Sequence, residues 1–529
     1  MERWRPRRTI NKQEDFILKR LRKTRKLFAF LRDYRQELFD EEFQGELEEI
    51  YRQTGAGKPA MPPAFLAMVT LLQGYTKVSD AEAVELTIVD LRWQMVLDRL
   101  GETDPAFAQS TLVEFRNRLI ETDMDRRLLE RTIELAKKTK AFDWKKLPKD
   151  LRIAIDSSPL EGAGRVEDTI NLLAHAARKI VECIATLLNC SFEEIAKKSG
   201  IPVLIESSVK SALDINWGDN KAKSEAINKL IWQIDSLDNY LKKHFKTELK
   251  KLPLKDLYET LQRIREQDLE PDPLGGGGVK IREGVSPDRL ISIEDKEMRH
   301  GRKSNSKAFN GYKRHVATDL ETNLIMACAV MPANRPEGDA APDLKDDIAR
   351  QILRISELHC DRGYIASDAI HEILDDGGEI ICKPWMPHNS IGKYFTKMDF
   401  KINLRDMTIM CPAGEIAYIE LGSIAVFDRN VCRDCELRSY CTKSATREGR
   451  TVLINEDEHL QQRLRKMAAT KKGRSLYRQR TSVEHSLARI SHRQGNKARY
   501  RGTRKNLYDL RRVATIQNLE IIDSKLNAA

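Results

Sequence analysis

The sequence predicts an α/β protein whose core is a mixed sheet with flanking helices. Three observations lead to this prediction. Residues 1–145 carry helical patterns, residues 151–156 alternate as a strand does, and strand patterns alternate with helical ones after residue 280. Once a long helical segment and a cysteine-rich segment are set aside as insertions, the remaining series is typical of one sheet covered by helices.

The first region, residues 1–145, is expected to be a helical domain for DNA binding or dimerisation. It contains the apolar helix "FLAMVTLLQGY", followed by a capping box that Ser79 and Glu82 form at the start of the next helix. The final helix, "STLVEFRNRL", is expected to turn Arg116 and Arg118 outward. Short helices with tight turns suit a helix-turn-helix DNA reader, and they suit an ordinary helical bundle equally well.

The sheet-containing core is predicted to comprise residues 146–164, 280–385 and 460–520. "LRIAID" predicts a strand that ends on Asp156, and the helical region 165–279 is then read as an insertion. "YKRHVATD" and "LIMACAVM" predict a hairpin around "LETN". "ISELHCD" predicts a strand that leads to Asp361, and "EIICKPW" predicts one more strand.

The composition favours a nucleic-acid partner. The 529 residues carry a formal net charge of +11. The segment from Gln461 to Arg512 contains 17 Lys and Arg and only two acidic residues. No apolar run approaches the ~18 residues of a membrane span, and the first residues lack the apolar core of a secretory signal. The nine cysteines are odd in number and unevenly spaced, so we expect a soluble protein of a reducing compartment.

Three acids are candidates for one metal site. Asp156 and Asp361 each follow an apolar strand, and if both strands lie in one sheet their carboxylates emerge at the same edge, because neighbouring strands lie ~5 Å apart. Glu484 is the only acid between residues 461 and 508, and it shares a predicted helical face with Tyr477 and Arg480. Taken alone, Glu484 would be an exposed ion-pair partner of Arg480, which contributes only a few tenths of a kcal/mol.

Together these segments resemble a DDE transposase of bacterial insertion sequences, a family whose catalytic core has the RNase H or retroviral-integrase fold. The matching stretches are "AIDSSPLEGAGRVEDT", "CDRGY" and "YRQRTSVEHS". The last is similar to the Tyr-x2-Arg-x3-Glu-x6-Lys signature of one large transposase group. Tyr477, Arg480 and Glu484 fit this signature, whereas Ser491 stands where the signature has lysine.

The resemblance implies that Asp156, Asp361 and Glu484 are catalytic and hold two Mg²⁺ or Mn²⁺ ions, for which carboxylate oxygens are suitable ligands. It implies that water cleaves double-stranded DNA at terminal inverted repeats, and that the freed 3′-OH then attacks target DNA. Two DNA ends must be brought together, which implies a homodimer in the active complex. The expected location is the bacterial cytoplasm, in association with the nucleoid through DNA.

Basic residues near these acids are expected to contact DNA phosphates, which supplies affinity without sequence choice. Asp339 and Asp343 are rival acids, in a segment that follows a Pro-containing loop. The candidates for DNA contact are Arg116, Arg118, Lys313, Arg314, Arg362, Tyr477, Arg480, Arg489, Arg493, Lys497, Arg501, Arg504 and Lys505.

A cysteine cluster in residues 386–459 predicts a second metal site. Cys411 precedes a Cys-x2-Cys knuckle of Cys432 and Cys435, and Cys441 follows it. Four thiolates suit tetrahedral zinc in a closed, structural site. Four free thiols in a reducing compartment are the alternative.

Two other functions stay open. One is a DNA-binding protein descended from a transposase that has lost catalysis, against which the intact set of three acids argues. The other is a two-metal nuclease that never joins strands, which a strand-transfer assay separates from a transposase.

Overall fold

The structure is a computed structural model of the chain. It describes residues 2–21, 27–51, 60–139, 142, 150–216, 218–272, 278–304, 306–385, 394–442 and 449–527. The predicted starts of the core at residue 146 and of the cysteine-rich insertion at residue 386 lie outside these ranges.

The N-terminal region is helical, as predicted. The apolar helix α4 is buried along most of its length, and the capping box of Ser79 and Glu82 starts α5. Arg116, expected to face outward, is buried on α7 and forms a 2.7 Å ion pair with Asp80, so that expectation is wrong. The helices are α1 (Lys12–Arg20), α2 (Leu27–Leu38), α3 (Glu41–Glu49), α4 (Pro63–Thr76), α5 (Asp80–Val89), α6 (Leu91–Leu97), α7 (Gln109–Glu121) and α8 (Met124–Lys138).

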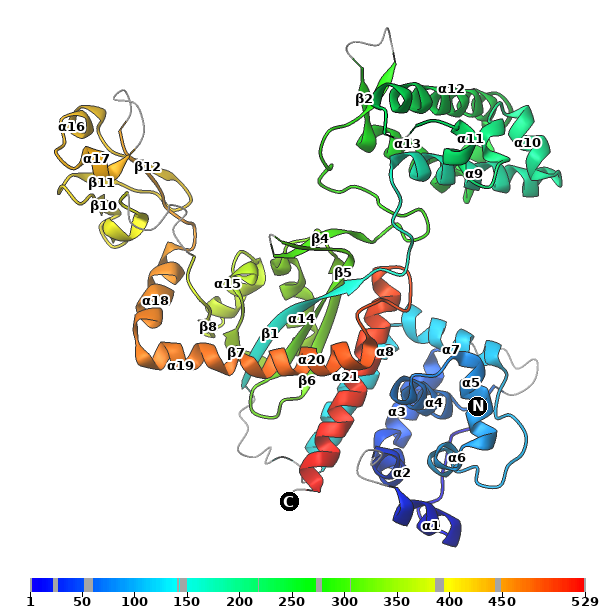
Figure 1. Ribbon diagram of the computed structural model, residues 1–529. Coiled ribbons are helices and arrows are strands. Elements are labelled where there is room, and N and C mark those ends of the chain that lie inside the picture. Colours follow the sequence, from blue (N-terminus) through cyan, green and yellow to red (C-terminus); the bar gives the residue numbers. More distant parts are fainter. Residues whose placement is uncertain are drawn as a thin grey trace.

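A mixed sheet forms the centre of the molecule (Figure 1). Its order is β4-β5-β1-β7-β8, and β6 also pairs with β5. β5 runs antiparallel to β1 and to β6, whereas β7 runs parallel to β1 and to β8. The strands are β1 (Asp150–Glu161), β4 (Arg299–Ser304), β5 (Lys307–Asp319), β6 (Ile325–Pro332), β7 (Arg354–His359) and β8 (Glu379–Ile381).

Helices cover both faces of this sheet. Ala154 of β1 packs in one apolar cluster with residues of α20 and α21, while its neighbours Ile153 and Ile155 belong to the cluster that includes α14 and α15. Alternate residues of a strand point to opposite faces, so Asp156 lies on the α20 side of β1 and Ser157 on the other side. These helices are α14 (Ala341–Ala349), α15 (Asp368–Asp375), α20 (Thr481–Gln494) and α21 (Thr503–Leu526).

The predicted strand end at Asp156 is wrong, because β1 continues to Glu161. β5 pairs with β1 as far as Glu161, whereas β7 stops at His359. Asp156 therefore lies within a strand that has lost its neighbour on one side, and this leaves its edge accessible.

Two segments inserted in the core have apolar clusters of their own. The helical insertion forms a cluster from residues 170–293, in which apolar side chains at helical spacing from Ile227 to Leu241 are buried. The cysteine-rich segment forms a smaller one. Figure 1 shows both segments projecting from the sheet. Their elements are α9 (Thr169–Leu188), α10 (Phe192–Lys198), α11 (Val209–Leu213), α12 (Asn220–His244), α13 (Leu254–Asp268), β2 (Leu269–Pro271), β3 (Val279–Ile281), β9 (Lys401–Asn403), β10 (Thr408–Met410), β11 (Ile416–Tyr418), β12 (Ile424–Val426), α16 (Arg429–Arg433), α17 (Arg438–Cys441) and β13 (Thr451–Leu453).

The chain returns from the cysteine-rich segment through α18 (Glu458–Ala469) and α19 (Lys471–Gln479) to α20. α20 crosses the sheet over β1 and β5, and α21 packs against β6, α8 and α4. Among the helices of the described ranges, none is long and apolar enough to cross a membrane.

Candidate active site

The two aspartates occupy corresponding positions along two adjacent strands. β1 and β7 are parallel neighbours, and Ala154 is paired with His359. Two residues farther along each chain come Asp156 and Asp361. Both aspartates therefore lie just beyond the last pair of this parallel ladder, at the same edge of the sheet. The prediction that both strands belong to one sheet is thus confirmed.

Glu484 reaches the same edge from α20. Val483 and Leu487 of α20 share an apolar cluster with Ala154 of β1, which fixes the helix over this strand. Arg480 joins the two acids, since its Nη1 lies 3.4 Å from Asp156 Oδ1 and its Nη2 lies 3.2 Å from Glu484 Oε1. The first and third acids are therefore separated by a single guanidinium group.

That guanidinium stands where a cation bound by the two acids would stand. Within the described ranges, no three His, Cys, Asp or Glu side chains come close enough together to hold a metal ion. The donor set itself fits Mg²⁺ or Mn²⁺, because it consists of carboxylate oxygens alone. Burial raises the pKa of Asp156, and the positive charge of Arg480 acts in the opposite direction.

Glu337 is a further acid at this edge, and no sequence pattern predicted it. It opens η4 (Glu337–Ala340), and its Oε1 accepts a hydrogen bond from Ser157 Oγ. A Cβ on Gly363 would lie 2.4 Å from Glu337 Oε2, so this carboxylate lies against the turn that follows Asp361. The negative charge of Glu337 also raises the pKa of Asp156.

The rival acids of the same segment are placed differently. Asp339 forms a 3.0 Å ion pair with Arg335, and Asp343 lies on α14, where burial raises its pKa. All three acids lie within "RPEGDAAPD". No spacing rule distinguishes Glu337 from the other two, because the distinction depends on how η4 packs beside η5 (Arg362–Tyr364).

A neutral histidine lies beneath the acids. His315 of β5 is opposite Ser157 in the register, and its Nδ1 lies 2.7 Å from Tyr364 Oη. Burial lowers the pKa of His315 to about 3. The charge of Glu337 and, to a lesser extent, that of Asp156 add to burial in raising the pKa of Tyr364, which shows that this pair lies close to the acids.

Several predicted DNA contacts are engaged within the protein. Arg314 is 1% exposed and donates to Ser158, Ser491, Gln494 and Gly495, so its predicted phosphate contact is wrong. Ser491, at the lysine position of the signature, thus receives a hydrogen bond from a buried arginine. The other engaged candidates, with their partners, are Arg116 with Asp80, Arg118 with Glu114, Lys313 with the Arg335 carbonyl, Tyr477 with the Leu464 carbonyl, Arg493 with Glu520, and Arg504 with Asp123 and Asp125.

The remaining candidates face solvent to different degrees. Arg362 is half-buried beside Asp361, whose Oδ1 accepts from the Arg362 backbone N–H. Arg501 is exposed and pairs with Glu294. The exposed candidates for which the described residues provide no ion pair are Arg489, Lys497 and Lys505.

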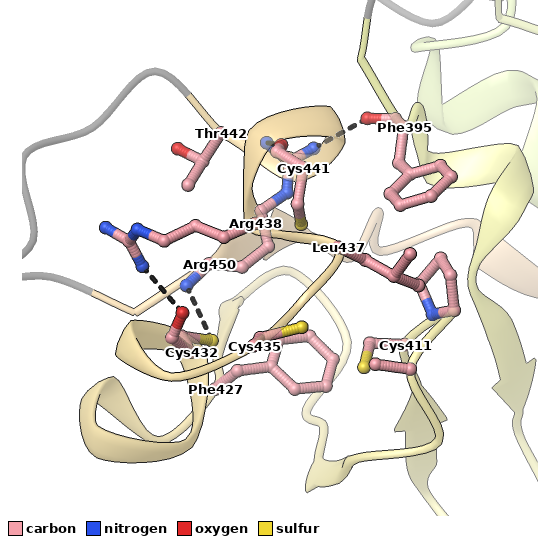
Figure 2. Close-up of a pocket in the computed structure, with 12 residues that line it drawn as sticks. Phe395, Cys411, Phe427, Cys432, Cys435, Leu437, Arg438, Cys441, Thr442 and Arg450 are labelled. Atoms are coloured by element: carbon pink, nitrogen blue, oxygen red, sulfur yellow. Dashed lines mark hydrogen bonds between the residues drawn. The ribbon is translucent and has the colours of Figure 1, made fainter.

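The four cysteines of the predicted zinc site line one small pocket (Figure 2). None of them is in a disulfide, and the backbone N–H of Arg450 donates to Cys432 Sγ at 3.5 Å. Burial raises the pKa of Cys441, the positive charge of Arg450 acts in the opposite direction, and the proximity of the other three cysteines adds to the rise. As they stand, no three of these thiols are close enough to share one metal ion.

Comparison with known proteins gives two family matches. Residues 407–522 match the transposase DDE domain, and residues 18–118 match a transposase domain known as DUF772. The first match contains Glu484 and the four cysteines, begins inside the segment predicted to be an insertion, and leaves Asp156 and Asp361 outside. No curated protein matches the chain, and no solved structure does. The two matches together cover less than half of the chain, and they show that it carries transposase domains towards both ends, consistent with a DDE-type insertion-sequence transposase.

Proposed function

We propose that this protein is a DNA transposase that cleaves the ends of its insertion sequence and joins the freed 3′-OH ends to target DNA. One observation carries the proposal. Asp156 and Asp361 extend adjacent parallel strands, and Arg480 joins Asp156 to Glu484, so acids separated by more than 300 residues of sequence reach one edge of the sheet.

The strand arrangement supports an RNase H-like core. β1, β5 and β6 form an antiparallel set, and the chain then passes through α14 to β7 and through α15 to β8, both parallel to β1. The proposed core keeps the predicted division of the chain, with the helical and cysteine-rich segments as insertions. The N-terminal helices are proposed to bind DNA or to hold the dimer together.

Asp156, Asp361 and Glu484 would hold two Mg²⁺ or Mn²⁺ ions. When bound, such ions activate the attacking oxygen and stabilise the leaving one. Glu484 is 51% exposed and Arg480 24%, so both can meet a substrate at the surface. Arg480 must move away from the two acids for cations to bind, and its guanidinium is then available to the charged phosphodiester.

Two reactions follow in sequence. In the first, the oxygen of water bonds to the phosphorus at the end of the element, and the 3′ oxygen of the element strand leaves as a 3′-OH. In the second, that 3′ oxygen bonds to a phosphorus of the target, and a 3′ oxygen of the target leaves. Neither reaction requires a covalent protein intermediate.

The cysteine pocket is proposed to hold a structural zinc ion. Four thiols line the pocket, three of them packed against the small apolar cluster of this segment, and thiolates are common ligands of zinc. Binding would draw the sulfurs together and would stabilise a segment with few buried apolar residues.

A strand-transfer assay tests the proposal. Purified protein is incubated with Mg²⁺, a labelled duplex carrying the DNA that flanks the gene, and a supercoiled target plasmid. A transposase gives labelled plasmid. Cleavage without labelled plasmid would indicate the nuclease alternative, and binding without cleavage would indicate a transposase-derived DNA-binding protein. The control is Asp156→Asn, which removes one carboxylate with little change of volume and should bind DNA without cleaving it.

A further inference from the structure

A cavity of about 330 Å³ lies between α20 and the end of α21. One wall is α20, which contributes Ser482, His485 and Arg489. The opposite wall is the end of α21, and Asn323 in the turn between β5 and β6 closes one end. Residues 482, 485, 486 and 489 lie at intervals of three and four along α20, so they share one helical face.

The cavity has an excess of positive charge. Arg489 on α20 and Lys525 on α21 are exposed, and the described residues provide neither with an ion-pair partner. Glu520 is an acid of the lining, and Arg493 already neutralises it at 2.5 Å. Two cationic side chains therefore face a shared space without a matching anion.

Hydrogen-bond donors converge on the same space. Ser482 Oγ donates to Asn323 Oδ1 at 2.6 Å, which leaves the Asn323 amide nitrogen as a donor. Ser524 contributes a hydroxyl group and His485 an imidazole ring. A group with several acceptor oxygens and a negative charge matches this set, and phosphate is such a group.

The cavity and Glu484 lie on different faces of α20, because the cavity lining includes Ser482, His485 and Arg489 but not Glu484. Arg489 is five residues beyond Glu484, which is roughly 7.5 Å along the helix axis and about 140° around it. The cavity is also about ten times the volume of one water molecule, which leaves room for a phosphate with part of its sugar.

We propose that this cavity binds a backbone phosphate of DNA, on a different face of α20 from Glu484. The inference rests on the proposed function, because it supposes that DNA reaches Glu484. Free inorganic phosphate has the same chemistry, so the experiment distinguishes these two sources.

The test measures how DNA binding depends on salt. Fluorescence anisotropy gives the affinity for a 30-base-pair duplex over a series of NaCl concentrations, for the wild type and for the double variant Arg489→Gln/Lys525→Gln. Losing one phosphate contact should lower the magnitude of the slope of log affinity against log salt by about 1. Glu520→Gln, which removes the acid of the lining, should change the affinity in the opposite direction. Lys250→Gln/Lys251→Gln removes the same charge from an exposed part of the helical insertion and is the matched control.

The proposal would be overturned if the slope of log affinity against log salt were the same in the double variant as in the wild type. It would also be overturned if the control variant lowered that slope as much as the double variant does. In a second arm, thermal stability is measured in phosphate and in chloride at equal ionic strength. If phosphate stabilises the wild type but not the double variant, and the DNA slope is the same in both, free phosphate is the ligand. That result would also overturn the proposal. Because no cleavage is measured, failure of the strand-transfer assay does not affect this result, and circular dichroism verifies that each variant is folded.

Discussion

Replacing Arg480 by glutamine is expected to tighten the binding of Mn²⁺ to the DNA-free protein about tenfold. The reason is that the Arg480 guanidinium contacts both Asp156 and Glu484 and so competes with a cation for the same carboxylates. Removing it leaves two carboxylates whose mutual repulsion a bound cation relieves.

The magnitude follows from the two ion pairs. Glu484 is half exposed, and such pairs contribute ~0.2–1 kcal/mol. Asp156 is 18% exposed, so its pair with Arg480 is screened less, and we assign it about 1 kcal/mol. A cation must break both pairs at a cost of roughly 1.5 kcal/mol, which corresponds to about a factor of ten in affinity.

Electron paramagnetic resonance of free Mn²⁺ measures this affinity without any DNA cleavage. Arg478→Gln is the matched control. It removes the same charge from an exposed position of α19, only two residues from Arg480. The reasoning is refuted if Arg480→Gln binds Mn²⁺ no more tightly than wild type, or if Arg478→Gln gives the same gain.

Three more outcomes are expected. Glu337→Gln should lower the cleavage rate at least tenfold and leave DNA affinity unchanged, because the Glu337 carboxylate lies between Ser157 and the turn after Asp361. Single-turnover kinetics measure the cleavage rate, and fluorescence anisotropy measures the DNA affinity. An unchanged cleavage rate would remove Glu337 from the site. His315→Gln should reduce the loss of folding stability between pH 7 and pH 5. The pKa of His315 is depressed to about 3 in the folded protein and is ~6.5 in the unfolded chain, so neutral His315 contributes its full stability above pH ~6.5. That contribution is lost as the pH falls, by about 2 kcal/mol between pH 7 and pH 5. Urea titrations at both pH values measure that loss, and equal losses in variant and wild type would contradict the assignment. Purified protein should contain about one zinc ion per chain, and Cys432→Ser should lower both zinc content and solubility; elemental analysis that finds no zinc in the wild type would refute the zinc site.

Much of the fold could be predicted because its elements have strong local signals. The residues before Asp156 alternate as a strand does, and the apolar side chains from Ile227 to Leu241 repeat at helical spacing. Strand limits were harder to predict. β1 extends to Glu161 because β5 pairs with it that far, and pairing of this kind cannot be read from the strand's own residues.

The site was only partly predictable for a similar reason. Asp156, Asp361 and Glu484 follow recognisable patterns, whereas Glu337 joins them through the packing of one short turn against another. Arg314 has the same charge as an exposed arginine, and only its burial against Ser491 and its neighbours shows that it serves the fold.

Crystallography of the complex with its cognate DNA end and Mn²⁺ tests the central claim most directly. Anomalous scattering locates manganese independently of the protein atoms. The account predicts two manganese peaks, bound by carboxylate oxygens of Asp156, Asp361 and Glu484, with Arg480 withdrawn from Asp156. Manganese bound elsewhere, or Glu484 still held apart from the aspartates by Arg480, would contradict it.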